Sequence, residues 1–310
     1  MLSLCLLMPR IRVLSVVART ALTIKPRNAR SATIGVILRG NKLVSVIVPT
    51  FNRQTELEKC LASIGYSDYL YVESIVVDNN EVNRGAAGGR NFGAKQAKGD
   101  YLLFVDDDNI VDRQMISHLV RFFEEHQDCV MAGPLMFYKD NPLKIWLCGC
   151  RINMLTSQAE YRGTGFRQED GEYYLKVGHL PNCFMVRRED FEAVGGFDEK
   201  YIIMYEEADF AHRLKRKLKG NIYIYSKAKI YHNISQDKKP YIFESKERAY
   251  LVGRNRVYFM RKNAGALRFL IFIFIFLPIV VFIYEFNLLR GGHFKMAGCF
   301  LAGTLRGFIL

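Results

Sequence analysis

No two cysteines stand at the CxxC spacing, and the seven cysteines of the chain are odd in number. These absences exclude a zinc ribbon and a complete disulfide framework, and they favour a reducing compartment. Disorder and fibrous structure are excluded too, because 50% of the residues are hydrophobic and only 24% are charged. A chain of 310 residues is long enough for two domains or for one large domain with a sizeable core.

Acidic side chains are absent from residues 1–43, which carry eight Lys and Arg residues. Much of the net charge of +13 therefore lies in this segment, and no nucleic-acid-binding motif accompanies it, so we expect no nucleic acid as a partner. The composition is typical of an organelle transit peptide, but an unstructured extension or a start codon placed too far upstream accounts for it as well. We expect residues 1–42 to form a basic, disordered extension.

From Leu43 onward, apolar runs alternate with helix-like segments, which predicts an α/β domain with a largely parallel sheet over residues 43–235. Three of the runs are predicted strands, namely Val44–Val48, Glu73–Val77 and Tyr101–Val105. Each is followed by polar residues, and in open α/β sheets ligands bind beyond the carboxyl ends of the strands. The recurrence therefore indicates one site.

Three adjacent carboxylates, Asp106, Asp107 and Asp108, follow the third predicted strand. They repel one another, so a chain has little structural reason to place them there unless a cation compensates their charge. Hard oxygen ligands suit magnesium or manganese. The alternative is a solvated acidic turn in which Asp108 or Asn109 caps the helix that follows, and the residues alone leave both open.

The Gly-rich segment Asn83–Asp100 has neither GxGxxG after a strand nor GxxxxGK[ST]. The dinucleotide-binding fold and the phosphate-loop enzymes therefore both lack their fingerprint. Its glycines could serve only turn geometry. Its position gives it more weight, because Arg90 and Asn91 would lie between two strand ends that already carry polar residues.

Five motifs occur in order between Leu43 and His232: VSVIVPTFNR, IVVDNN, NRGAAGGRNFGAKQAKGDYLLFVDDD, VGGFDE and YEEADFAHRLKRK. Together they resemble the inverting family 2 nucleotide-sugar glycosyltransferases, particularly the rhamnosyltransferase-like branch. The resemblance implies a GT-A fold, in which helices flank a mixed, mainly parallel sheet. It also implies a nucleoside-diphosphate sugar as donor and Mn²⁺ or Mg²⁺ as cofactor.

The resemblance also assigns the donor side of the site. It implies that the first strand end contacts the nucleoside, that Asp78 contacts the nucleobase and that Arg90 lies where the Gly-rich loop closes over the nucleotide. The strand-end residues are Pro49, Thr50, Phe51 and Asn52.

For the metal, the resemblance places the two acids of the DxD motif at Asp106 and Asp108, with Asp108 the better ligand and Asp107 nearer the ribose. His232 falls where many relatives place a histidine that reaches the metal or the diphosphate, although a packed or solvated histidine is an equal alternative. A metal between the phosphates would offset the charge that develops on the leaving nucleoside diphosphate.

The base is expected in the second half, because inversion needs a carboxylate that takes the proton of the acceptor hydroxyl. The segment Tyr205–Asp209 matches the family's ED-x-D pattern, whose second acid is the base and falls on Glu207. This sequence has Glu207 at a position where Asp is commoner in the family, which leaves Glu206 as an alternative base. For Asp209, a pairing with Arg213 along one helix is the alternative.

Residues 236–265 interleave basic and aromatic side chains, which is typical of a helix at a membrane interface. The run Phe269–Tyr284 has sixteen residues without a charge and would measure about 24 Å as a helix, against a hydrocarbon core of about 30 Å. A buried core helix is the alternative, but the lack of a polar face favours membrane insertion. We expect residues 266–310 to be membrane-attached, and the Lys and Arg residues before the run predict a cytoplasmic catalytic domain.

These expectations describe a membrane-attached, metal-dependent, inverting glycosyltransferase. It would move a hexosyl or deoxyhexosyl group from a nucleoside diphosphate to a lipid-linked or growing glycan acceptor. A nucleotidyltransferase is one alternative, but it would attack phosphorus and have no need for the segment that carries the base. A non-catalytic, membrane-bound nucleotide-sugar binding module is the other.

Overall fold

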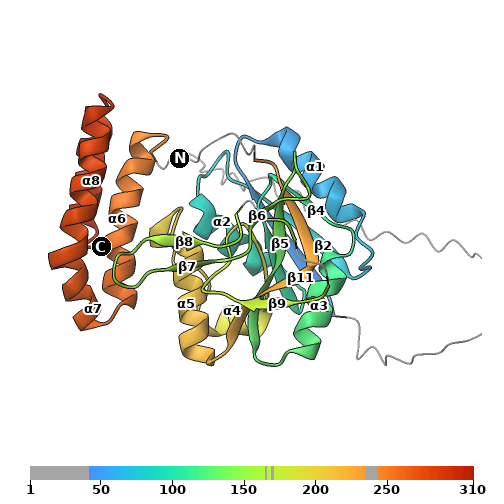
Figure 1. Ribbon diagram of the computed structural model, residues 1–310. Coiled ribbons are helices and arrows are strands. Elements are labelled where there is room, and N and C mark those ends of the chain that lie inside the picture. Colours follow the sequence, from blue (N-terminus) through green and yellow to red (C-terminus); the bar gives the residue numbers. More distant parts are fainter. Residues whose placement is uncertain (1–41, 165, 169–170, 235–242) are drawn as a thin grey trace, which may run out of the picture.

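The computed structural model describes residues 42–164, 166–168, 171–234 and 243–310. The expectations for residues 1–41 lie outside this part of the chain. A nine-stranded sheet forms the centre, with the order β2-β1-β3-β10-β5-β11-β4 and with β6 and β9 paired to β5 and β11. Figure 1 shows this sheet with helices on both faces and a further group of helices beside it.

One half of the sheet is parallel and corresponds to the three strands predicted first. Strand β1 (Val44–Thr50) lies between β2 (Val72–Asp78) and β3 (Tyr101–Val105) and runs parallel to both. In this register Thr50 lies beside Asp78. The carboxyl ends of the three strands therefore meet at one edge, as expected from their polar ends.

The other half of the sheet is mixed. Strand β10 (Cys183–Arg187) is antiparallel to both β3 and β5 (Cys129–Tyr138), whereas β11 (Asn221–His232) is parallel to β5. The short β4 (Asn109–Val111) and β9 (Tyr174–Lys176) pair antiparallel with β11. The antiparallel β10 brings the segment before it, which contains Asn182, back to the edge where β3 ends.

Shorter strands extend this half. Strand β6 (Ile145–Leu147) pairs with β5, and a separate two-stranded sheet consists of β7 (Cys150–Ile152) and β8 (Ala159–Tyr161).

Two helical layers cover the sheet. Helices α1 (Gln54–Gly65) and α3 (Met115–Glu125) pack on one face, and α2 (Gly85–Gln96), α4 (Arg188–Ala193) and α5 (Glu206–Leu218) pack on the other. The buried side chains of α3 recur every three or four residues, so they form one apolar stripe against the sheet. The mixed sheet with helices on both faces agrees with the architecture that the motifs implied.

The C-terminal helices form a separate layer next to α5 (Figure 1). Helix α6 (Lys246–Asn263) is followed by α7 (Ala266–Ile271), a π-helical segment (Phe272–Phe276) and α8 (Leu277–Arg290), and α9 (Phe294–Arg306) ends the chain. In the described part of the chain, one continuous helix, Ala266–Arg290, has the length and apolar composition needed to cross a membrane. The π-helical segment directly precedes Pro278, whose missing N–H removes one hydrogen bond of the regular ladder.

Helix α6 uses its basic side chains within the protein. Lys262 Nζ lies 2.6 Å from Asp198 and 3.0 Å from Asp209, and the side chains of Arg254 and Arg256 are buried. Helix α6, which lies in the segment predicted for a membrane interface, therefore also forms the contact between the C-terminal helices and the sheet domain.

Candidate active site

The ends of the first three strands form one polar edge. Thr50 Oγ1 donates a 2.6 Å hydrogen bond to Asp107 Oδ2, and both side chains are buried. Asp78, beside Thr50, accepts a hydrogen bond from the backbone N–H of Asn80, and Asn80 Oδ1 in turn accepts from the N–H of Asn52. These bonds hold the residues that the resemblance assigned to the nucleotide in one contiguous group.

Phe51, Asn52 and Asp78, three of the expected nucleotide contacts, are exposed, whereas Pro49 is half-buried. Phe51 follows β1 directly and is 47% exposed. An exposed aromatic ring beside polar side chains is suited to stack on a nucleobase or ribose.

Arg53 is a site residue that the sequence analysis missed. Its Nη1 lies 2.7 Å from Asp108 Oδ2 and 3.4 Å from Asp107 Oδ1, while its own side chain remains half exposed. It supplies a positive charge where the acidic triplet was expected to bind a cation. The signal in the sequence was its place at the end of the TFNR motif.

Asp108 and His232 form an oxygen–nitrogen pair that suits a divalent ion. Asp108 Oδ1 lies 3.4 Å from His232 Nε2, and the His232 ring packs on Trp146 with ring centroids 4.2 Å apart. Burial alone would raise the pKa of Asp108, but the hydrogen bond and charge of His232 and the charge of Arg53 outweigh it and lower that pKa. Asp108 thus stays ionised, as a metal ligand must.

The protein contributes few ligands of its own. Within the described residues no group of three or more His, Cys, Asp or Glu side chains is placed to hold a metal. Two ligands nevertheless fit Mg²⁺ or Mn²⁺ in such sites, because these ions keep several waters and take the rest of their shell from substrate phosphates. Asp106, the other predicted ligand, directs its Oδ1 to Arg90 instead, at 2.8 Å.

Arg90 is a buried cation among three carboxylates. Its side chain is 2% exposed, and its Nη atoms lie 2.8 Å from Asp106, 2.8 Å from Glu207 and 3.2 Å from Glu206. A guanidinium can be buried only when such partners compensate its charge. The nucleotide contact expected for Arg90 stays a prediction, and the structure adds a link between the acidic triplet and the candidate base.

The glycines of the Gly-rich segment explain how the Arg90 side chain can be buried against the sheet. A Cβ atom on Gly93 would clash with Ile47 of β1, and one on Gly89 would lie 2.9 Å from the Asn79 side chain. Helix α2 can therefore approach β1 and β2 closely only because these positions lack a side chain.

The two candidate bases differ in access. The Glu206 side chain is 4% exposed and its Oε2 has no partner among the described residues, whereas the Glu207 side chain is 15% exposed. Glu207 Oε1 also accepts a hydrogen bond from the N–H of Asn182 at 3.1 Å. Burial raises the pKa of Glu207 to about 8 against the opposing charge of Arg90, and Glu206 and Asp106 add to the shift.

Asn182 is a second residue that the sequence did not reveal. It precedes β10 with a positive φ of 64°, and its Nδ2 lies 3.3 Å from His232 Nε2. Its backbone contacts Glu207 and its side chain contacts His232, so it connects the candidate base with the candidate metal ligand.

The loop before α5 is strained. Ile202, Met204 and Tyr205 have positive φ angles of 63°, 68° and 69°, which side chains other than glycine rarely adopt. Backbone of this kind persists only where its surroundings hold it, and it is common next to functional groups. Here it sets the direction in which α5 presents Glu206 and Glu207.

Asn255 of α6 holds this loop in place. Its Nδ2 donates to the carbonyl oxygens of Tyr201, Ile203 and Met204 at 2.9, 2.8 and 3.1 Å. Arg254 adds a 2.6 Å bond to the carbonyl of Lys200. The residue pattern of this polar stretch predicts a membrane interface and does not indicate its contact with the loop.

We expect Asn255→Ala to lower kcat about 10–100-fold while leaving donor affinity unchanged, because the loop would no longer hold the base in register. Buried carbonyls left without a donor should also lower the free energy of unfolding by about 1–3 kcal/mol. Steady-state kinetics and nucleotide titration separate the two effects. Asn287→Ala, at an exposed position on α8, is the control, and equal kinetics in both variants would contradict the role of Asn255.

The structure shows the pairing that was the alternative for Asp209. Asp209 is fully buried and pairs with Arg213 at 2.7 Å along α5, with Asn263 of α6 as an additional donor at 3.0 Å. Phe197 is buried in the core, and Asp198 caps a short helix by accepting from the N–H of Lys200. Both are structural.

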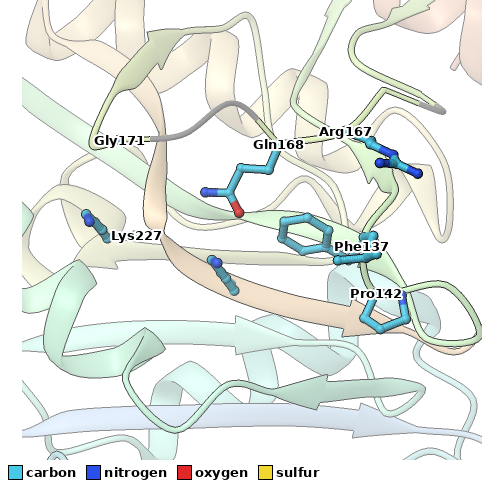
Figure 2. A pocket seen from close by; sticks show the side chains of 8 residues that line it. Phe137, Pro142, Arg167, Gln168, Gly171 and Lys227 are labelled. Carbon is cyan, nitrogen blue, oxygen red and sulfur yellow. The ribbon is translucent and has the colours of Figure 1, made fainter.

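A cavity of about 400 Å³ lies elsewhere, between β5, β11 and the segment around residue 168. Figure 2 shows Phe137, Arg167 and Lys227 in its lining. None of the predicted site residues lines it, so the candidate active site is the strand edge and not this cavity.

Comparisons with known proteins agree with this geometry. Residues 79–195 match the family model described as Glycosyl transferase family 2. An uncharacterized glycosyltransferase of Haemophilus influenzae is 32% identical over an alignment of 195 positions that covers 56% of this chain and 62% of that protein. A GalNAc(5)-diNAcBac-PP-undecaprenol beta-1,3-glucosyltransferase of Campylobacter jejuni is 31% identical over an alignment of 123 positions that covers 32% of this chain and 40% of that protein.

The match therefore spans less than two thirds of either relative. Among solved structures, the mannosyltransferase PcManGT of Pyrobaculum calidifontis, in complex with GDP-Man and Mn²⁺, has a TM-score of 0.51 at 13% identity. The similarity covers 87% of this chain and 88% of that one, and it concerns the fold. Residues 79–195 therefore match the family 2 glycosyltransferases, and the fold of the chain is similar to that of the GT-A glycosyltransferases.

Proposed function

We propose that the protein transfers a sugar from a nucleoside diphosphate to an acceptor hydroxyl with inversion at the anomeric carbon. The observation that carries the proposal is the buried Arg90, which pairs with Asp106 of the acidic triplet and with Glu207 of α5. Asp106, on the donor side, and Glu207, the candidate base, are thereby held in one site. A nucleotidyltransferase would have no use for such a base.

The donor would bind across the ends of β1, β2 and β3. Phe51 would stack on the nucleoside, and Asp78 and Asp107 would accept hydrogen bonds from the nucleobase and the ribose. The GDP-Man bound to the mannosyltransferase of similar fold supports a nucleotide sugar as donor.

A divalent ion, Mn²⁺ or Mg²⁺, would be held by Asp108 and His232, and the Mn²⁺ in the same neighbour supports this cofactor. When bound, it would neutralise charge on the leaving diphosphate. Arg53 now neutralises Asp108, and its half-exposed side chain is free to turn toward the phosphates.

We expect Asp108→Asn to remove the metal dependence of nucleotide binding. The amide keeps the size of the carboxylate but loses its charge, so affinity for a nucleoside diphosphate in Mn²⁺ should fall to the value measured in EDTA. Calorimetric titration in both conditions makes the comparison, with exposed Asp140→Asn as the control. Unchanged affinity in Mn²⁺ would remove Asp108 from the metal site.

Glu207 would take the proton of the acceptor hydroxyl. It is the more exposed of the two adjacent glutamates, and its raised pKa is suited to a general base near neutral pH. Asn182 and Arg90 would hold the carboxylate in its orientation through their bonds to Oε1.

The pH profile should report this group. A base acts in its deprotonated form, so kcat/KM should rise with pH and level off above about 8. The same measurement on Glu207→Gln should show no such rise. A rise that persists in the variant would mean that another group titrates.

The acceptor is proposed to be lipid-linked or a growing glycan, and the protein to be attached to a membrane with its catalytic domain on the cytoplasmic side. The name of the Campylobacter jejuni relative, which acts on an undecaprenol-linked glycan, supports the first point. The apolar helix Ala266–Arg290 supports the second.

Inversion is tested by the anomeric configuration of the product. ¹H NMR of the isolated glycoside, with the donor's own configuration as reference, should show the opposite anomer. Retention would contradict the proposed role of Glu207, because a single displacement cannot give it.

A further inference from the structure

Helix Ala266–Arg290 has two different faces. One is buried against α6 and α9 through Phe272, Leu277, Val280 and Leu288. The opposite face is exposed and apolar, with Phe274 at 75% and Phe282 at 70% exposure. Its other members are Ile275, Ile279, Ile283 and Phe286. A soluble protein rarely exposes such a continuous apolar face unless a partner covers it.

The buried face lies along most of α6. The first half of α6 shares an apolar cluster with Leu288, and its second half shares another with Phe272 and Leu277. In between, Arg256 Nη2 donates to the Tyr284 hydroxyl at 3.2 Å. Side chains of the two helices therefore meet in both halves of α6, in antiparallel order.

This packing determines which orientations in a membrane are possible. Helix α6 carries Arg254, Arg256 and Lys262. Arg254 donates to the carbonyl oxygens of Lys200 and Tyr201 before α5, and Lys262 pairs with Asp209. If the apolar helix crossed a bilayer while packed in this way, these charged groups would lie at the depth of the hydrocarbon. Charged side chains are strongly disfavoured there.

The chain after the apolar helix returns to α6 as well. A Cβ atom on Gly303 of α9 would clash with the carbonyl oxygen of Tyr250, and one on Gly307 would lie 2.6 Å from that of Arg254. The backbones of α6 and α9 are thus in direct contact, and Arg261 also donates to the carbonyl of Phe308. Both ends of the apolar helix are held on the side of the sheet domain.

From these contacts we infer that the helix Ala266–Arg290 lies in the plane of a bilayer, with its exposed face in one leaflet and both ends on the side of the catalytic domain. The occupant of the face is the lipid surface. Exposed basic residues flank the helix at Arg268, Arg290 and Lys295, where they can contact anionic headgroups. The inference rests on the membrane attachment proposed above and replaces a spanning helix with a monotopic one.

The arrangement has a consequence for the site. Asn255, which holds the loop before Glu206, lies on α6, the helix that packs on the buried face of the membrane-bound helix. The acceptor side of the site is thereby tied to the lipid surface from which a lipid-linked acceptor would come.

Cysteine labelling in membranes of a bacterial host tests the topology. The full chain, with Cys5 and Cys299 replaced by serine, receives either Lys246→Cys before the apolar helix or Lys295→Cys after it, and both positions are exposed. A membrane-impermeant maleimide should label both in inverted vesicles and neither in intact spheroplasts. Labelling of Lys295→Cys from the outside, with Lys246→Cys labelled only from the inside, would establish a spanning helix and overturn the inference.

Vesicle flotation tests the face itself. Wild-type protein should float with vesicles of phosphatidylcholine and phosphatidylglycerol, and Phe282→Glu should reduce the bound fraction at least tenfold. Leu70→Glu replaces an even more exposed apolar residue of the sheet domain and should have no effect. A wild-type protein that stays unbound as a soluble dimer would show that a second copy covers the face. Both measurements omit substrates, so a failure of the proposed sugar transfer would leave their outcome unchanged.

Discussion

Glu207→Gln should lower the rate of sugar transfer by about 10²–10⁴ while donor binding survives. The amide keeps the size of the side chain and can still accept from the N–H of Asn182, but it has no basic oxygen for the acceptor proton. Single-turnover transfer, measured with saturating donor, reports the chemical step. Nucleotide titration of the same variant checks that the donor site is intact.

Glu206→Gln is the matched comparison, since it removes the same charge one residue earlier. Glu206 is almost closed to solvent and contacts Arg90 alone among the basic side chains described, so its loss should cost much less in transfer. If the Glu207 variant transfers sugar at nearly the wild-type rate and the Glu206 variant is inactive, Glu206 and not Glu207 is the base.

Arg90→Met should both abolish transfer and destabilise the protein by about 3–5 kcal/mol, the usual cost of removing one partner from a buried ion pair. The variant would leave Asp106, Glu206 and Glu207 close together without the cation that compensates them. Denaturant unfolding gives the stability change. It also shows whether the loss of transfer occurs in a folded protein.

Arg121→Met serves as the control for this change. Arg121 pairs with Glu125 on the surface of α3, and such exposed, solvent-screened pairs contribute little to stability. Arg90→Lys is informative too, because one ammonium cannot reach three carboxylates as a guanidinium does. Wild-type stability in Arg90→Met would mean that the three acids do not depend on Arg90.

The strand edge could be predicted from sequence because its signals are local. Tyr101–Val105 is an unbroken apolar run that ends at charged residues, and the strand has these bounds in the structure. The acidic triplet follows β3 and Thr50 ends the neighbouring β1, so parallel pairing alone brings them together. Prolines and glycines at the strand ends strengthened this prediction.

The base network was only partly predictable, because its contacts join distant parts of the chain. Arg90 and Glu206 are 116 residues apart, and nothing near either residue indicates the other. The antiparallel β10, which brings Asn182 to Glu207, has no distinctive sequence pattern and was not predicted.

The C-terminal region shows a different limit. The run Phe269–Tyr284 correctly predicted an apolar helix. The sequence pattern of α6, in contrast, is the same for basic residues that face lipid headgroups and for basic residues that face the protein. Asn255 and Arg254 satisfy the backbone of the loop at residues 200–204, and only the folded structure identifies these partners.

The central claim, that this chain is a nucleotide-sugar transferase, is tested most directly by turnover. Full-length protein in detergent is incubated with a panel of nucleotide sugars, Mn²⁺ and membrane lipid extract, and the released nucleotide is identified. The account predicts release of a nucleoside diphosphate from one donor with the sugar recovered on an acceptor, and no transfer by Glu207→Gln. Release of pyrophosphate, or no transfer from any donor, would contradict it.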